Sequence, residues 1–177
     1  MNELKVGDYV RTSQDGQYSE VYMFGHWNPG AVAKYLRIRT PSASVEISES
    51  HMMEVKGRGF IPASMIGLGD IVSNEEEVVS IKEVERKGIF APFTRSGTIR
   101  VDDVVCSNYI SLQPDSANLM MWGSTMVDSG ISWQWILHSF MRVYTSFFDI
   151  RKDEYTEDGI SVGLMLPWKV SRWVLGV

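Results

Sequence analysis

The chain has 177 residues, of which 44% are hydrophobic and 22% charged, a composition typical of one globular domain with an apolar core. The formal net charge of −5 argues against a nucleic-acid-binding surface, which requires clustered Lys and Arg. The single cysteine, Cys106, excludes an internal disulfide and a zinc site built from several cysteines. The three histidines lie far apart in the sequence and give no support for a metal site, and no cofactor is predicted.

A short turn and strand near the start of the chain recurs later. Residues 5–10 contain Gly7-Asp8, and residues 66–72 contain Gly69-Asp70, 62 positions further on. A polar turn, an alternating strand and a longer strand-like stretch follow each copy in the same order. An internal duplication of this kind predicts two similar β-units packed around a pseudo-two-fold axis.

The first alternating strand is expected at residues 19–24, and His26 comes directly after it. The turn-forming residues Asn28, Pro29 and Gly30 follow. Two interpretations of this histidine stay open. It could act as a general base, because an imidazole titrates near neutral pH, or it could be an exposed turn residue without a chemical role.

The strand pattern continues over residues 35–55 and includes Ile47-Ser48-Glu49-Ser50-His51. An isolated Ser-x-x-His pattern favours a histidine at the end of a strand, where backbone groups satisfy the imidazole. The short motif therefore has no specific functional meaning on its own.

Residues 88–110 contain two runs of alternating apolar residues, joined by Ser96-Gly97 and followed by the polar pair Asp102-Asp103. Strand-length runs bounded by Gly, Ser and Asp predict an antiparallel hairpin or meander. Cys106 lies within the last apolar run, so we expect its side chain to point into the core as a small hydrophobic group.

The composition changes after residue 113. Short strands with polar turns predict an all-β domain over residues 1–113, and residues 114–177 are expected to form a helical, aromatic-rich extension. The apolar spacing of residues 128–149 predicts an amphipathic helix, and a second helix is expected at residues 168–175. The sequence contains neither a signal-peptide pattern nor an apolar run long enough to span a membrane.

The pattern GxxAPxTxxGTIxVxxVxxSxY over residues 88–109 resembles the last strands of the Hint domain of hedgehog-type autoprocessing proteins. Residues 47–51 resemble that family's (L/I)-T-x-x-H motif, with Ser48 at the position of the threonine. The resemblance covers the predicted β-domain well and the extension weakly. It implies an all-β, Hint-type pseudo-two-fold module of short antiparallel strands with a small C-terminal helical extension.

In that family the domain cleaves the peptide bond before its own first residue, a cysteine. The thiol attacks the preceding carbonyl to form a thioester, which a second nucleophile resolves. The resemblance implies that His51 protonates the departing amide nitrogen and that Ser48 hydrogen-bonds the scissile peptide.

Two positions depart from the hedgehog pattern. His26 lies in the region where animal hedgehogs have an aspartate that activates a sterol, so water or another nucleophile fits equally well here. Asn108 stands where hedgehogs have a second cysteine, which removes any thiol exchange at this position.

The family's opening Cys-Phe strand has no counterpart ahead of Val6. We therefore expect cleavage, an intramolecular N–S acyl shift of the cysteine type, only in an intact precursor and not in the chain as it stands. The alternative is a degenerate, non-catalytic Hint fold that acts as a binding or structural module.

The resemblance also implies partners and a location. The first partner is the upstream domain of the same precursor. The aromatic residues of the C-terminal helices could form a buried helix face or could contact sterol or membrane lipid, and both interpretations stay open. Hedgehog-type precursors enter the secretory pathway, so an extracellular location is expected by resemblance alone.

Overall fold

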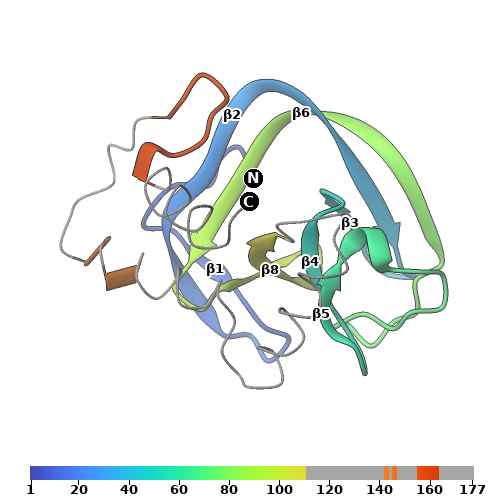
Figure 1. Cartoon of the computed structure of the whole chain (residues 1–177). Coiled ribbons are helices and arrows are strands. Elements are labelled where there is room, and N and C mark those ends of the chain that lie inside the picture. Colours follow the sequence, from blue (N-terminus) through green and yellow to red (C-terminus); the bar gives the residue numbers. More distant parts are fainter. Residues whose placement is uncertain (111–141, 144, 147–154, 164–177) are drawn as a thin grey trace, which may run out of the picture.

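The computed structural model describes residues 1–110, 142–143, 145–146 and 155–163, and these are mostly β-structure (Figure 1). The strands and the single short 3-10 helix of these residues are β1 (Tyr9–Arg11), β2 (Tyr18–Arg39), β3 (Ser44–Ile47), β4 (His51–Val55), β5 (Gly59–Pro62), η1 (Ala63–Met65), β6 (Ser80–Thr94), β7 (Thr98–Val101) and β8 (Val104–Ile110). The predicted all-β fold is confirmed.

The predicted C-terminal helices fall almost wholly outside the described residues. Within the predicted helix at residues 128–149, only residues 142–143 and 145–146 are described, and these four are helical. The predicted helix at residues 168–175 lies outside the described residues. The helical extension therefore stays a prediction.

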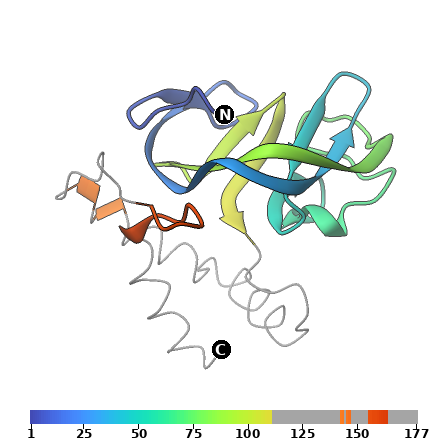
Figure 2. The ribbon, with the colours of Figure 1, turned by 90° about the horizontal axis from the view of Figure 1, so that it is seen from above.

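Two four-stranded antiparallel sheets make up the described β-structure. In the first sheet, β2 pairs with β1 near its start, with β3 near its end and with β6 along most of its length. The second sheet has the order β5-β4-β8-β7. Figures 1 and 2 both show β2 and β6 side by side in one long, curved arch. Three register shifts interrupt the β2–β6 pairing, and such bulges bend a strand pair and increase its twist.

The main core is formed by inward-facing residues of several strands, because alternate side chains of a strand lie on opposite faces. In β3, for example, Val45 and Ile47 are buried while Ser44 is exposed. The buried residues of this cluster are Ile38, Ala43, Val45, Ile47, Met53, Val55, Ala63, Ile66, Val72, Val78, Ile99, Val104 and Cys106.

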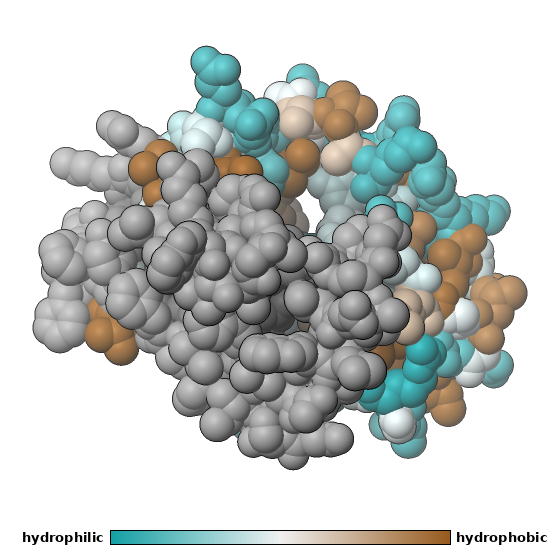
Figure 3. All heavy atoms as spheres, in the orientation of Figure 1, coloured by the Kyte–Doolittle hydropathy of each residue, from teal (hydrophilic) through white to brown (hydrophobic). Residues whose placement is uncertain are grey.

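Hydrophilic side chains alternate with hydrophobic ones over the arch of β2 and β6 (Figure 3). Lys34 and Glu83 form an ion pair of 2.8 Å there. Glu46 of β3 pairs with both Arg37 and Arg86 at 2.7 Å. Because Lys34 and Glu83 are largely exposed, their pair contributes little to stability, whereas Glu46 is half-buried between its two arginines.

The first Gly-Asp turn is closed by four hydrogen bonds. The Lys5 amide donates to Asp8 Oδ2 at 2.7 Å, and the Asp8 amide donates to the Lys5 carbonyl at 3.1 Å. Gly7 and Asp8 exchange backbone hydrogen bonds with Val21 on β2, both 2.8 Å long. Gly7 has a φ of 96°, a conformation that glycine adopts without strain.

The second Gly-Asp turn repeats this arrangement. The Gly67 amide donates to Asp70 Oδ2 at 2.8 Å, and the Asp70 amide donates to the Gly67 carbonyl at 3.3 Å. Gly69 and Asp70 exchange backbone hydrogen bonds with Val78, and Gly69 has a φ of 88°. The duplication predicted from the sequence is therefore present at the level of single hydrogen bonds.

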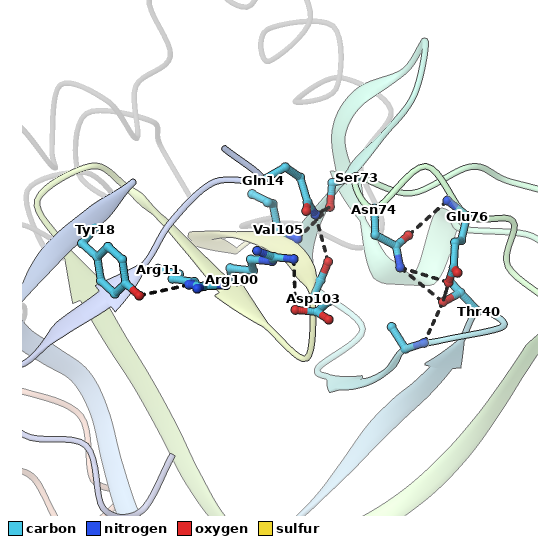
Figure 4. Close-up of polar contacts among 11 residues, drawn as sticks. Arg11, Gln14, Tyr18, Thr40, Ser73, Asn74, Glu76, Arg100, Asp103 and Val105 are labelled. Atoms are coloured by element: carbon cyan, nitrogen blue, oxygen red, sulfur yellow. Dashed lines mark hydrogen bonds and ion pairs between the residues drawn. The ribbon is translucent and has the colours of Figure 1, made fainter. Parts of the chain in front are cut away.

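A polar cluster ties the turns of the two halves together (Figure 4). Gln14, in the turn after β1, donates from Nε2 to the Asp103 carbonyl at 2.9 Å. Its Nε2 also lies 3.4 Å from Ser73 Oγ, which accepts from the Val105 amide at 2.7 Å. Three segments distant in the sequence are thus joined through two side chains.

The predicted pairing of the runs on either side of Ser96-Gly97 is wrong. The strand before this turn, β6, pairs with β2, and the strand after it, β7, pairs with β8. The hairpin closes instead at Asp102 and Asp103, which have φ values of 46° and 67°. Positive φ at both central residues is typical of the type I′ turn, which matches the twist of antiparallel strands.

The predicted turn at Asn28, Pro29 and Gly30 is also corrected. These residues lie inside β2, at a register shift in its pairing with β6. The Asn28 side-chain oxygen accepts from the amides of Gly30 and Ala31 at 3.1 and 3.0 Å. The local turn chemistry therefore makes a bulge within a long strand, and His26 lies inside the strand rather than after it.

Candidate active site

Ser48 and His51 form a compact unit at the start of β4. The backbone amide of His51 donates to the Ser48 carbonyl at 3.0 Å, and Ser48 Oγ lies 2.8 Å from His51 Nδ1. The intervening Glu49 carbonyl accepts from the Ser64 amide at 2.9 Å, which fixes this turn to η1. The Ser-x-x-His spacing thus brings a hydroxyl against an imidazole.

Burial lowers the pKa of His51 from 6.5 to about 4, because a poorly solvated site disfavours the imidazolium. The ring is therefore neutral at pH 7. If the Ser48 hydroxyl donates to Nδ1, then Nε2 of His51 carries the proton, because a neutral imidazole has one N–H. A neutral imidazole can both accept and donate a proton, which is the property that acid–base catalysis requires.

Asn108 lies on β8 and is buried, with 4% of its surface exposed. Its Oδ1 accepts from the Thr94 amide at 3.1 Å and lies 2.8 Å from Thr94 Oγ1. Its Nδ2 donates to the Pro92 carbonyl at 2.8 Å, and its backbone amide donates to the Gly97 carbonyl at 2.9 Å. Asn108 therefore ties β8 to the end of β6, a role that the sequence analysis did not assign to it.

Strand pairing brings the candidate residues toward one region. His51 on β4 pairs with Ile110 on β8, two residues beyond Asn108. A register shift separates that pair from the next one, Met53 with Cys106, so Asn108 lies in a bulge of β8. The Asn108 side chain also donates to the Pro92 carbonyl of β6. The residue before Pro92, Ala91, is the strand partner of His26 on β2.

His26 contacts a C-terminal segment that lies beside β2 in Figures 1 and 2. Its Nε2 lies 2.6 Å from the carbonyl oxygen of Asp158, and His26 forms a β-bridge with Ile160. The histidine is half-buried. It is therefore not the exposed turn residue of the alternative interpretation.

Cys106 is 3% exposed and belongs to the main core, as its position in an apolar strand predicts. Burial raises the pKa of the thiol from 9.0 to about 12, so the thiol stays protonated at neutral pH. Because the thiolate is the nucleophilic form, this cysteine does not supply the nucleophile. Among the described residues, no group of three or more His, Cys, Asp or Glu could hold a metal ion.

A family model described as "Hint module" matches residues 1–176. The chain belongs to the Hint module family. It is 30% identical over 141 residues to "Protein hedgehog" of Drosophila ananassae, covering 70% of this chain and 29% of that protein. "Protein qua-1" of Caenorhabditis elegans is 24% identical over 154 residues, covering 69% of this chain and 13% of that protein. This Hint module thus spans less than a third of the length of these curated relatives.

The fold of this Hint module is similar to that of a solved intein. A crystal structure of a substituted variant of the gp41-1 intein has a TM-score of 0.51 and 21% sequence identity, covering 60% of this chain and 85% of that one. The Hint-type fold and the resemblance to hedgehog-type domains are therefore confirmed. In the part of the chain that the structure describes, no helix is long and apolar enough to cross a membrane.

Two parts of this region could not be recognised from the sequence. Thr94 is completely buried beside Asn108, and the Thr in the matched block was its only signal. The Asp158 carbonyl is a backbone group, so no residue type could have revealed its contact with His26. The predicted roles of His51, Ser48 and His26 and the predicted division at residue 113 stay predictions.

Proposed function

We propose that this Hint module is the autoprocessing part of a hedgehog-like precursor and cleaves the peptide bond that joins it to an upstream domain. The observation that carries the proposal is the 2.8 Å contact between Ser48 Oγ and His51 Nδ1. A neutral imidazole held by a hydroxyl, in a chain of this family, suits proton transfer to and from a reacting peptide bond.

In the proposed first step, a cysteine thiol supplied upstream attacks the preceding carbonyl carbon. A C–S bond forms and the C–N bond breaks. With Nδ1–H donated to Ser48 Oγ, Nε2 of His51 takes the thiol proton and delivers it to the departing nitrogen. The proton that leaves sulfur thus ends on the new amine, so the step balances. Ser48 orients the imidazole and can accept a hydrogen bond from the scissile amide. Positioned proton transfer of this kind contributes roughly 10²- to 10⁴-fold.

In the proposed second step, a hydroxyl nucleophile such as water attacks the thioester and releases the upstream domain. His26 is our candidate general base for this step. The upstream domain is thus the first proposed partner, the secretory pathway the proposed location, and sterol or lipid contact by residues 114–177 a further proposal.

The test is cleavage of a reconstructed precursor. A reporter followed by a strand that begins Cys-Phe is fused ahead of Met1, and dithiothreitol is added to intercept the thioester, with products followed by mass spectrometry. We expect release of the reporter, and we expect His51→Ala to slow it by roughly 10²-fold or more. Ser48→Thr should retain cleavage, whereas Ser48→Ala should slow it about tenfold.

The matched control is Asn74→Ala, which changes a half-buried polar residue in a turn of the second half. Its cleavage rate should stay within about twofold of the parent rate. A folded parent fusion that releases no reporter would contradict autoprocessing and would support the binding or structural module instead.

A further inference from the structure

Residues 155–161 occupy the second edge of β2 at His26. On one edge His26 pairs with Ala91 of β6. On the other, the Trp27 amide donates to the Gly159 carbonyl at 2.8 Å, and the Ser161 amide donates to the Gly25 carbonyl at 3.1 Å. The C-terminal segment therefore adds to the sheet like a short antiparallel strand.

The segment is a turn with its own hydrogen bonds. The Gly159 amide donates to the Thr156 carbonyl at 2.8 Å, and the Thr156 amide donates to the Ile160 carbonyl at 2.9 Å. The Ile160 amide donates to Thr156 Oγ1 at 3.1 Å. Because these hydrogen bonds fix the conformation of the turn, the Asp158 carbonyl has a defined position beside β2.

Close contact with β2 requires glycine at position 159. Gly159 has a φ of 82°, and a Cβ placed there would lie 2.6 Å from Asn28 Cβ and 2.7 Å from the Trp27 carbonyl oxygen. Neither the conformation nor the space suits another residue. The tight contact brings the preceding carbonyl, that of Asp158, to the His26 ring.

The contact between His26 Nε2 and the Asp158 carbonyl defines the state of the imidazole. A carbonyl oxygen only accepts, so Nε2 must carry the proton that is donated across the 2.6 Å distance. In the neutral ring Nδ1 then has the free lone pair. The structure gives Nδ1 no hydrogen bond among the described residues.

We propose that residues 155–161 are a positioning element that holds His26 with Nε2–H on the Asp158 carbonyl and Nδ1 ready to accept a proton. The inference rests on the proposed autoprocessing function and concerns its second step. Nδ1 takes the proton of a hydroxyl nucleophile, water or an alcohol, as its oxygen bonds to the thioester carbon. The C–S bond breaks, and the imidazolium returns the proton to the departing sulfur.

The two steps can be measured separately in the precursor fusion. Cleavage by added dithiothreitol reports thioester formation, which needs His51. Cleavage without added thiol requires the hydroxyl nucleophile and therefore His26. A merely structural role of the C-terminal turn would change both rates together, whereas a positioning role changes only the second.

We expect Gly159→Ala to slow cleavage without thiol about tenfold or more while dithiothreitol cleavage stays within about twofold. Hydrogen exchange should show loss of protection at the Trp27 amide. His26→Gln keeps an N–H that can donate to Asp158, so it should retain that protection and still slow cleavage without thiol by about 10²-fold. Thr156→Val, which removes only the Oγ1 acceptor, is a milder second variant if Gly159→Ala folds poorly.

The matched control is Gly16→Ala. Gly16 has a φ of 83°, nearly that of Gly159, but an added Cβ there meets nothing within 4 Å. It therefore carries the same backbone strain without the steric clash, and both rates should stay near those of the parent.

Three results would overturn the inference. The first is unchanged cleavage without thiol in both Gly159→Ala and Thr156→Val, and the second is an equal decrease of both rates. The third is a parent precursor that is not cleaved by added dithiothreitol and therefore forms no thioester. This result would contradict the proposed function itself, and it is measured before any variant is made. The first two leave dithiothreitol cleavage of the parent intact, so the two kinds of failure are distinguishable.

Discussion

His51 and Asn108 lie 57 positions apart, at corresponding places in the two halves of the β-module, and on strands that pair with each other. His51 is half-buried and contacts the Ser48 hydroxyl at 2.8 Å. Asn108 is buried, and its amide group contacts Thr94 and Pro92. One copy thus carries a titratable group, whereas the other carries a neutral amide with its donor and acceptor satisfied.

This difference shows how a duplicated fold can separate chemistry from structure. The Gly-Asp turns have the same hydrogen bonds in both halves, so the frame is shared. On this shared frame, the equivalent position holds a reactive group, His51, in one half and a structural contact, Asn108, in the other. Four predictions test this comparison, beginning with the largest expected effect.

Asn108→Ala should lower the free energy of unfolding by roughly 2–4 kcal/mol, because it leaves the Thr94 amide and the Pro92 carbonyl buried without their partner. Urea unfolding of the chain measures this. The control is Asn74→Ala, whose side chain contacts Thr40 and Glu76 in a less buried place and should cost about 1 kcal/mol or less. Equal losses in the two variants would show that Asn108 has no special structural role.

His51 should make stability depend on pH in the acid range. Its pKa in the folded chain is lowered to about 4 from 6.5, so below pH 6.5 the unfolded chain binds a proton that the folded chain does not. The resulting stability is fully present above pH 6.5 and is lost as the pH falls toward 4, by up to roughly 3 kcal/mol.

Urea unfolding at pH 7 and pH 4.5 tests this, with His51→Gln as the variant that cannot titrate. The parent should lose about 2–3 kcal/mol more than the variant between these two pH values. Parallel losses in the two proteins would mean that other groups dominate acid destabilisation.

Gly7→Ala and Gly69→Ala should each cost about 1 kcal/mol, because each forces alanine into a positive φ. The two costs should agree to within about 0.5 kcal/mol, since the turns are equivalent and an added Cβ meets no atom closer than 3.4 Å at either position. Thermal or urea unfolding provides the comparison. A large cost in only one variant would break the equivalence of the halves.

Glu46→Gln and Asp103→Asn should have the smallest effects, under about 1 kcal/mol each. The two acidic residues lie 57 positions apart, and each pairs with arginine: Glu46 with Arg37 and Arg86, and Asp103 with Arg100. The difference between parent and variant should shrink in 1 M salt, where exposed charges are screened. Salt-independent losses above 2 kcal/mol would contradict this interpretation.

Several features of the fold were predictable because they depend on nearby residues. The alternation of apolar residues indicated strands, and the repeated Gly-Asp pairs indicated the duplication. The family resemblance assigned Ser48 and His51 to one motif, whereas the contact between their side chains was not predicted and comes from the structure. The buried state of Cys106 followed from its place in an apolar strand.

Other features depended on contacts between distant residues. The pairing of β6 with β2, instead of with β7, could not be read from the turn residues Ser96 and Gly97. The bulge at Asn28 resembled a turn because a bulge and a turn use the same side-chain hydrogen bonds. This misplaced His26 at the end of a strand when it lies within one.

The β-class, the two equivalent turns and the family resemblance follow from the amino-acid sequence alone. Each of these depends on local conformational preference or on a pattern of residue types. By contrast, the link that Asn108 makes between β8 and β6 and the contact of the Asp158 carbonyl with His26 arise only in the folded chain. The backbone partners of the Asn108 side chain are 14 and 16 residues away, and the Asp158 carbonyl is 132 residues from His26. Because every residue carries the same backbone groups, only the folded arrangement of the strands selects which of them meet.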